Sequence, residues 1–219
     1  MIRMTRSYIQ IAIIVSVVTA PVFAAAVAGT AAPSSAPAIS QTVAAPKVVV
    51  KDPENRFTIM VPVDWSFQTS TGARTPAVSA RSHAAGSQLP DSVEVITQDL
   101  PTAINAQECG DKISQVMRYT IHRWNTLREG TVTFAGMPAY SRAYTWHTST
   151  GLERRSEQMC VTMGRRAFVM IGTTTNDQRG VREELPQLQR IIATFRPNAT
   201  NLPPSDHPAI PHSKSAGDH

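Results

Sequence analysis

Three polar residues of the sequence are of the types that hydrolases use for proton transfer. His147, Glu157 and Asp177 are residues from which such a site could be assembled. They are dispersed along the chain, and nothing marks a nucleophile beside them. The motifs G-x-S-x-G, H-E-x-x-H, Walker A and G-x-G-x-x-G are all missing from the sequence. We therefore predict no catalytic residue, and an extracytoplasmic hydrolase with a dispersed site stays an alternative.

The two cysteines, Cys109 and Cys160, are candidates for a disulfide bond. An exported chain meets oxidising conditions, in which such pairs form. The bond would tie the start of a predicted helix to a predicted strand. On that strand Cys160 faces away from Met159 and Val161. The bond can therefore form only if the helix covers the face of Cys160, and both outcomes stay open.

An aromatic row is the second feature that could carry a function. Tyr140, Tyr144 and Trp146 fall on one face of a predicted strand, because side chains alternate between the two faces. Tyrosine and tryptophan combine a large apolar body with a polar tip, which suits contact with a ligand or a partner. The sequence therefore predicts a possible ligand or partner surface here. A carrier of a small apolar ligand, held between sheet and helix, is a further alternative.

The remaining metal-binding residue types predict no metal site and no cofactor. His207, His212 and His219 lie in a Pro-rich segment, at spacings of five and seven that match no common ligand pattern. The methionines in the folded part occur in apolar strand and helix patterns, which favours core packing over copper binding.

Positive charge is too sparse to predict a nucleic-acid-binding protein. The formal net charge is +5, and it falls to +3 without Arg3 and Arg6 near the N-terminus. Two basic pairs, Arg154-Arg155 and Arg165-Arg166, flank a single predicted strand of about ten residues. At ~3.3 Å per residue they lie too far apart for one joint patch. We interpret each pair as a solvated strand end.

The periodicity of apolar residues predicts the elements that must position these side chains. Alternation or continuous apolar runs predict strands at 57–61, 92–100, 131–134, 139–148, 152–163 and 166–175. The clearest helix spans 103–124, and its apolar stripe consists of Ile113, Val116, Met117, Thr120, Ile121 and Trp124. A second helix is expected at 177–195, with a break near Pro186. Residues 66–89 resemble a loop that hides one strand at 77–81.

This order predicts an α+β fold, a three-layer α/β/α sandwich with a mainly antiparallel sheet. The strand at 166–175 is apolar on both faces, so we expect it at the centre of the sheet.

The ends of the chain differ in composition from this folded part. Residues 1–24 have the positive start, the apolar stretch and the Val22-Phe23-Ala24 site of a cleaved signal peptide, with an uncleaved anchor as the alternative. Residues 25–47 form an Ala/Pro/Ser linker, and residues 197–219 form a Pro- and His-containing disordered tail. The sequence therefore predicts a single folded domain at 48–196, between the linker and the tail. With 42% hydrophobic residues the chain is not wholly disordered.

Three short segments resemble those of PsbP-like and DcrB-like proteins. The first is the strand from Arg56 to Trp65, which reads Arg-Phe-Thr-Ile-Met-Val-Pro-Val-Asp-Trp. The second is the turn Gly136-Met-Pro-Ala139. The third is the C-terminal strand and helix from Arg166 to Arg196, which end in Ile-Ile-Ala-Thr-Phe-Arg. The resemblance covers about 57–196. It implies a PsbP-like α/β/α sandwich, an accessory or partner-binding role, and no catalytic set.

Together these observations favour an exported, non-catalytic accessory or protein-binding module of the bacterial cell envelope. We expect it to be periplasmic or extracellular and to bind an unidentified envelope protein. We expect no nucleic acid partner and no stable membrane span after cleavage of the leader.

Overall fold

The computed structural model describes residues 46–71, 76–83 and 89–203. The predicted signal peptide, nearly all of the linker and the histidines of the tail lie outside these residues. Among the helices in the described ranges, none is both long enough and apolar enough to cross a membrane.

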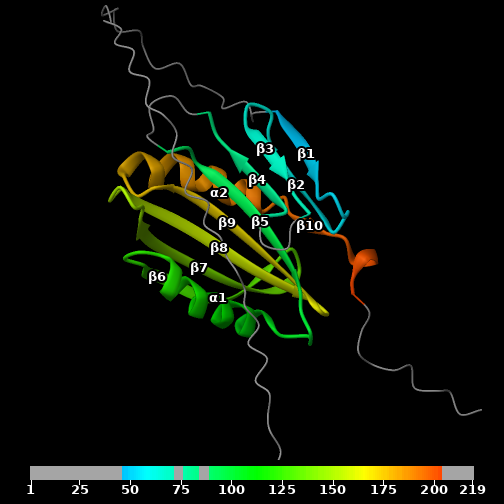
Figure 1. Ribbon diagram of the computed structural model, residues 1–219. Coiled ribbons are helices and arrows are strands. Elements are labelled where there is room, and N and C mark those ends of the chain that lie inside the picture. The colour runs from blue at the N-terminus through cyan, green and yellow to red at the C-terminus, as the bar shows by residue number, and fades with distance from the viewer. Residues whose placement is uncertain (1–45, 72–75, 84–88, 204–219) are drawn as a thin grey trace, which may run out of the picture.

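A seven-stranded antiparallel sheet forms the middle layer of the fold (Figure 1). Its strand order is β3-β4-β5-β9-β8-β7-β6. The bounds are β3 Ser66–Thr69, β4 Val78–Arg81, β5 Ser92–Asp99, β6 Asn125–Phe134, β7 Met137–His147, β8 Glu153–Met163 and β9 Arg166–Thr175. β9 lies at the centre of this order and is buried along most of its length. The predicted central position of this strand is therefore confirmed.

One face of the large sheet is covered by helix α1, Ala106–Thr120. The opposite face carries α2, Leu185–Ile192, and a small antiparallel sheet in the order β1-β2-β10. Its strands are β1 Lys47–Lys51, β2 Phe57–Pro62 and β10 Arg196–Pro197. Figure 1 shows α1 and α2 on opposite sides of the sheet. The predicted three-layer α+β sandwich is confirmed, with the small sheet sharing the third layer with α2.

Each face of the large sheet has its own apolar core. The core on the side of α2 joins β1 and β2 to β4, β5, β9 and α2, with Phe57, Phe168 and Phe195 in mutual ring contact. The core on the side of α1 is smaller and packs Ile113 and Met117 of the helix on β7, β8 and β9. Burying such side chains contributes roughly 2 kcal/mol each, so both layers are held by hydrophobic packing.

Helix α1 is shorter than the predicted 103–124. It starts after Asn105, whose side chain accepts a hydrogen bond from the backbone N–H of Glu108, while the Glu108 carboxylate accepts one from the backbone N–H of Asn105. It ends at Thr120, because Ile121 has an extended backbone and Arg123 a positive φ of 52°. Ile121 and Trp124 still pack on the same core from the connection that follows.

Two other regions differ from the pattern-based expectation. The predicted loop at 66–89 contains β3 as well as β4; all four residues of β3 are exposed, so no apolar alternation marks it. The second helix begins as a π-helical turn, Gly180–Glu184, before α2. Pro186, which has no N–H to donate, lies in the first turn of α2 directly after this π-helical turn, so the irregularity predicted near it is found.

The folded chain extends beyond the predicted start of the tail at residue 197. A short 3₁₀ helix spans Ala199–Asn201. The backbone N–H of Asn198 donates to the carbonyl of Arg56, and Arg166 donates to the carbonyl of Asn201. These bonds hold the chain against the domain up to this point.

Candidate binding groove beside the disulfide

Cys109 and Cys160 are joined by a disulfide, with their Cα atoms 6.5 Å apart. The bond links the first turns of α1 to β8 and spans 51 residues of sequence. It forms because α1 covers the face of β8 that carries Cys160. Val161, on the other face, belongs to the core on the side of α2. The alternative, in which the helix covers the face of Met159 and Val161, is thereby excluded.

The aromatic row lies beneath the same helix. Tyr140 and Tyr144 are 3% and 2% exposed, so the predicted ligand or partner surface is wrong for both. α1 covers them, because the two residues share the face of β7 that the helix packs on. Trp146 is half-buried at the end of this row, and its Nε1–H donates to Oγ of Ser156 at 3.0 Å. The tyrosines therefore fill the space between sheet and helix that a carried ligand would need.

Arg142 lies between the two tyrosines on this face and escaped the sequence analysis. Its side chain is 1% exposed. Nε donates to Glu129 at 2.8 Å, and an Nη donates to the Tyr140 hydroxyl at 3.0 Å, to the carbonyl of Gly110 at 3.3 Å and to Ser114. A signal was available: an arginine in the middle of an apolar row, at i+2 from one tyrosine and i−2 from the next.

The guanidinium of Arg142 also lies over two aromatic rings, 5.0 Å from the ring centre of Tyr140 and 5.5 Å from that of Trp124. The Tyr140 hydroxyl donates to Glu129 at 2.8 Å. This bond and that from Arg142 lower the pKa of Glu129, whereas burial raises the pKa of Tyr140. The cluster is thus a charged Arg–Glu pair with a neutral phenol, and it fixes α1 to the strands.

The three hydrolase candidates are not brought together. In the antiparallel pairing of β7 with β8, His147 lies opposite Glu153, four residues along the strand from Glu157, or ~13 Å away. Glu157 forms an ion pair with Arg128 at 2.7 Å. Asp177 is exposed and accepts a hydrogen bond from the backbone N–H of Gly180 at 2.7 Å. These contacts are structural, so the predicted dispersed site has no geometry that supports it.

The basic pairs are also placed differently from expectation. Arg154 and Arg166 are buried rather than solvated. Arg154 donates to the carbonyls of Leu89 and Pro90 at 3.1 and 2.9 Å. Arg166 forms two bonds to the carboxylate of Asp99, at 2.6 and 3.1 Å. Arg154 thus anchors the segment that precedes β5, and Arg166 anchors Asp99, the last residue of β5.

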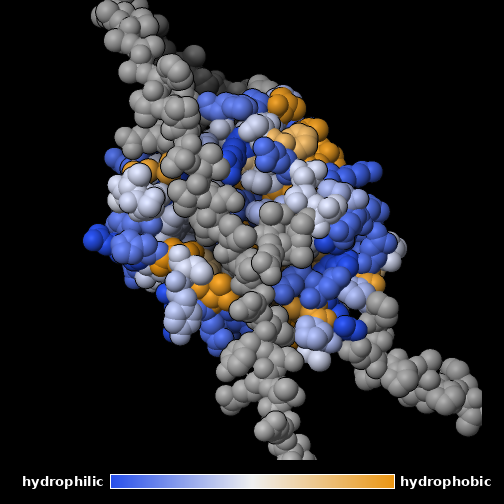
Figure 2. Space-filling view, in the orientation of Figure 1, coloured by the Kyte–Doolittle hydropathy of each residue, from blue (hydrophilic) through white to orange (hydrophobic). Residues whose placement is uncertain are grey.

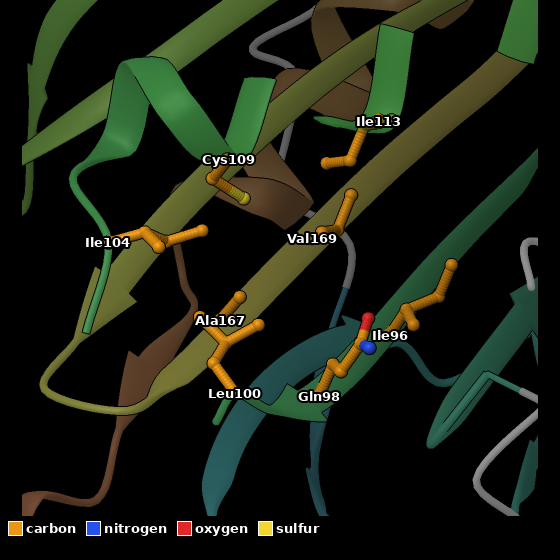
Figure 3. Close-up of a pocket in the computed structure, with 8 residues that line it drawn as sticks. All are labelled: Ile96, Gln98, Leu100, Ile104, Cys109, Ile113, Ala167 and Val169. Atoms are coloured by element: carbon orange, nitrogen blue, oxygen red, sulfur yellow. The ribbon is translucent and has the colours of Figure 1, made fainter. Parts of the chain in front are cut away.

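A groove remains open beside the disulfide, where α1 leaves part of the sheet uncovered (Figure 3). α1 lies over β6, β7 and β8, while β5 and part of β9 extend beyond it on the same face. The groove is lined by Ile96, Gln98, Leu100, Ile104, Cys109, Ile113, Ala167 and Val169.

The lining of the groove is apolar with one exception. Gln98 carries the single polar side chain among the residues labelled in Figure 3. Ile96, Gln98 and Ile104 are partly exposed, so they can be reached from solvent. The cavity volume of the groove is about 20 Å³, enough for one or two water molecules. The groove can therefore accept the tip of an aliphatic side chain, but not a large ligand.

The described residues contain no cluster of three or more His, Cys, Asp or Glu side chains that could hold a metal ion. The described histidines 83, 122 and 147 are not gathered into one site.

Comparison with known proteins rests on structure, because no family model matches this chain. No curated protein sequence matches it either. Among solved structures, the cyanobacterial PsbP protein CyanoP of Synechocystis sp. PCC 6803 aligns with a TM-score of 0.54 at 14% identity, covering 74% of this chain and 98% of its own. The chain has a PsbP-like fold.

A second solved structure with this fold is LpqN of Mycobacterium tuberculosis, described as involved in cell envelope biogenesis. It aligns with a TM-score of 0.52 at 14% identity, over 69% of this chain and 91% of LpqN. At this identity the likeness shows the fold alone. The PsbP-like part of the sequence resemblance is therefore supported at the level of fold, and the DcrB-like part stays a prediction.

Proposed function

We propose that this chain is an exported, non-catalytic accessory module of the cell envelope, and that it binds a protein partner through the groove beside α1. The observation that carries the proposal is the open apolar groove, in which Ile96 and Ile104 are partly exposed and Gln98 supplies the single amide. Such a site suits one aliphatic side chain of a partner, with the amide bonding to its backbone.

The size of the groove favours a protein partner over a carried ligand. Pockets for small molecules usually enclose several hundred Å³, whereas the cavity volume of this groove is only about 20 Å³. The tyrosines that suggested a carrier are buried under α1, and the Tyr140 hydroxyl is bonded to Glu129.

Export rests on the sequence. Residues 1–24 have the three parts of a secretory signal, and the disulfide fits an oxidising compartment. The PsbP-like fold is shared with LpqN, which is itself described as involved in cell envelope biogenesis. The leader, the disulfide and the fold all support a location in the envelope, and none of them depends on the groove.

A photo-crosslinking amino acid at position 98 tests the partner-binding proposal in intact cells. We expect a discrete crosslinked band from this position and none from the same amino acid at Val132, an exposed apolar position on the far edge strand β6. Ile96→Glu places a charge in the groove and should abolish the band from position 98. Identical patterns from positions 98 and 132, or a band that survives Ile96→Glu, would overturn the proposal.

Export is tested separately by the mass of the chain recovered from the envelope fraction. We expect a chain that lacks residues 1–24. Recovery of the full-length chain from the cytoplasm alone would contradict export but would leave the groove untouched.

A further inference from the structure

The outer edge of β1 is unpaired among the residues that the structure describes, because the small sheet has the order β1-β2-β10. β1 reads Lys-Val-Val-Val-Lys from Lys47 to Lys51, and it pairs with β2 over its whole length. Unpaired strand edges present backbone N–H and C=O groups on which another strand can add. The edge of β1 is therefore a place where a partner strand could bind.

The hydrogen bonds around β2 show which groups of β1 face this edge. Met60 lies opposite Val49, yet its backbone N–H and C=O both bond to the Thr194 hydroxyl on the other side of β2. In antiparallel pairs, bonded and non-bonded pairs alternate. Val49 therefore turns its own N–H and C=O away from β2.

The neighbouring pairs agree with this alternation. The N–H of Asp52 donates to the carbonyl of Phe57 at 3.2 Å, and the N–H of Val63 donates to the carbonyl of Pro46 at 3.1 Å. Even-numbered residues of this strand thus bond to β2. By alternation, Lys47, Val49 and Lys51 present their backbone groups to the free edge.

The same three residues carry the outward-facing side chains of β1. Lys47 and Lys51 are exposed, and Val49 is 52% exposed. Val49 lies beside Met60, which is 42% exposed on β2. Figure 2 shows hydrophobic surface in the upper right of the view, where Figure 1 places β1 and β3. An added strand would therefore meet a basic, an apolar and a second basic side chain in a row.

We propose that the free edge of β1 binds an extended acidic segment of a partner protein by strand addition. The matching segment has an acidic residue, any residue, an apolar residue, any residue and an acidic residue. Residues opposite one another across two strands lie on the same face, so each carboxylate lies beside one lysine and the apolar residue beside Val49. Three residues with outward backbone groups offer three donors and three acceptors to the segment.

A second copy of this chain does not fit the same edge. Antiparallel pairing of two β1 strands centred on Val49 would place Lys47 opposite Lys51 twice, and like charges directly opposite are unfavourable. Lysines on edge strands commonly prevent such self-association. The charge pattern therefore selects an acidic strand over the chain's own strand.

This surface is separate from the groove, so its test does not depend on the proposed groove partner. The probe is a fluorescent peptide whose core is Glu-Thr-Val-Thr-Glu, measured by anisotropy against the disulfide-bonded protein. We expect saturable binding that weakens with added salt, since exposed charges are screened within ~8 Å at physiological ionic strength. The control peptide, with the core Lys-Thr-Val-Thr-Lys, should bind at least about fivefold more weakly.

Reversing the protein's charges separates strand addition from general stickiness. The double variant Lys47→Glu and Lys51→Glu should prefer the Lys-containing peptide, reversing the order of the two affinities. The backbone is tested by Val49→Pro, which removes an outward N–H that β2 does not use and should abolish binding. Val49→Thr keeps that N–H and should retain binding, and Ile96→Glu in the groove should change nothing.

Amide hydrogen exchange locates the peptide. The amides of Val49 and Lys51 should exchange fast in the free protein and slow at least about tenfold when the peptide is bound, while those of Val48 and Val50 are already protected. Equal affinity for both peptides, protection at another strand, or binding to anionic phospholipid vesicles in place of the peptide would overturn the proposal. Failure of the groove crosslink would not.

Discussion

Gly110 of α1 lies against the ring of Tyr140 on β7, so close that a Cβ atom at residue 110 would come within 2.2 Å of the ring. Glycine in the middle of a helix ordinarily costs about 1 kcal/mol relative to alanine. Here it lets α1 pack on the buried phenol, whose hydroxyl bonds to Glu129. The close approach of helix and strand thus requires this glycine.

Gly110→Ala should therefore destabilise the protein, against its gain in helix propensity. We expect a loss of about 1–3 kcal/mol in the free energy of unfolding, because the ring must move out of a packed site. Chemical denaturation measures this loss. The control is Gly130→Ala on β6, where a Cβ meets nothing within 4 Å. A Gly110→Ala variant as stable as the Gly130→Ala variant would contradict the packing argument.

Removal of the disulfide should cost more. Replacing Cys109 and Cys160 together by serine frees a loop of 51 residues in the unfolded chain, for which chain entropy predicts a loss of ~4 kcal/mol. Urea unfolding of the variant and of the oxidised protein gives the difference. Thiol titration in denaturant should find no free thiol without reductant and two with it. Two thiols in both conditions would disprove the bond.

Arg142→Met should destabilise the protein by about 2–4 kcal/mol, because it removes the hydrogen bonds that the buried guanidinium makes to Glu129, Tyr140 and Ser114. It should also raise the pKa of Glu129 toward its ordinary value, since the bond from Arg142 helps to lower it. An NMR titration of the Glu129 carboxyl in the folded variant follows this change.

The matched control is Arg118→Met. The guanidinium of Arg118 lies 5.8 Å from the ring centre of Trp124, a ring that Arg142 also faces, but its side chain is exposed. We expect a loss below about 1 kcal/mol from it. Equal losses from the two arginines would indicate that the cation–π contact, and not the buried hydrogen bonds, is what stabilises the helix.

The stability of the protein should rise as pH falls from about 7.5 to about 5. Burial raises the pKa of Asp91 to about 6, with Glu184 adding to the rise while Thr174 and Arg154 oppose it. A carboxyl whose pKa is higher in the folded state binds its proton more tightly there. Its stabilising effect is complete below its pKa in the unfolded chain and is lost as pH rises through about 6. Burial raises the pKa of Glu94 too.

Asp91→Asn should remove most of this pH dependence, because the amide does not titrate. We expect the melting temperature of the variant to vary less over this pH range. The change in stability from one end of the range to the other should differ between the two proteins by on the order of 1–2 kcal/mol. Thermal unfolding at intervals of half a pH unit measures both slopes. Equal slopes for the two proteins would exclude Asp91 as the group responsible.

Much of the fold follows from short-range patterns. The central strand β9 could be recognised because its apolar residues occupy both faces, and the helix at 106–120 because its apolar stripe has a period near 3.6. β3 could not be recognised, since all of its residues are exposed and only pairing with β4 marks it as a strand. The end of α1 depends on the backbone turn at Arg123, which periodicity does not indicate.

The candidate sites show the same division. Alternation along β7 and β8 places Tyr140, Arg142 and Tyr144 on one face and Cys160 on the matching face of the next strand. The two-residue alternation of side chains along a strand shows which residues share a face. It does not show which of the two faces a helix covers. That choice depends on how α1 and α2 divide the two sides of the sheet. It turned the tyrosines into core residues and allowed the disulfide.

By itself, the sequence determined the α+β class and the antiparallel hairpins, because these depend on residues near one another in the chain. Only the tertiary structure decided what stays exposed. The groove exists because α1 lies over β6, β7 and β8 and leaves β5 uncovered. Among the described residues, the outer edge of β1 is free because β1 pairs with β2 alone. Both features arise between segments distant in sequence, where long-range packing decides which backbone and side-chain groups are left without a neighbour.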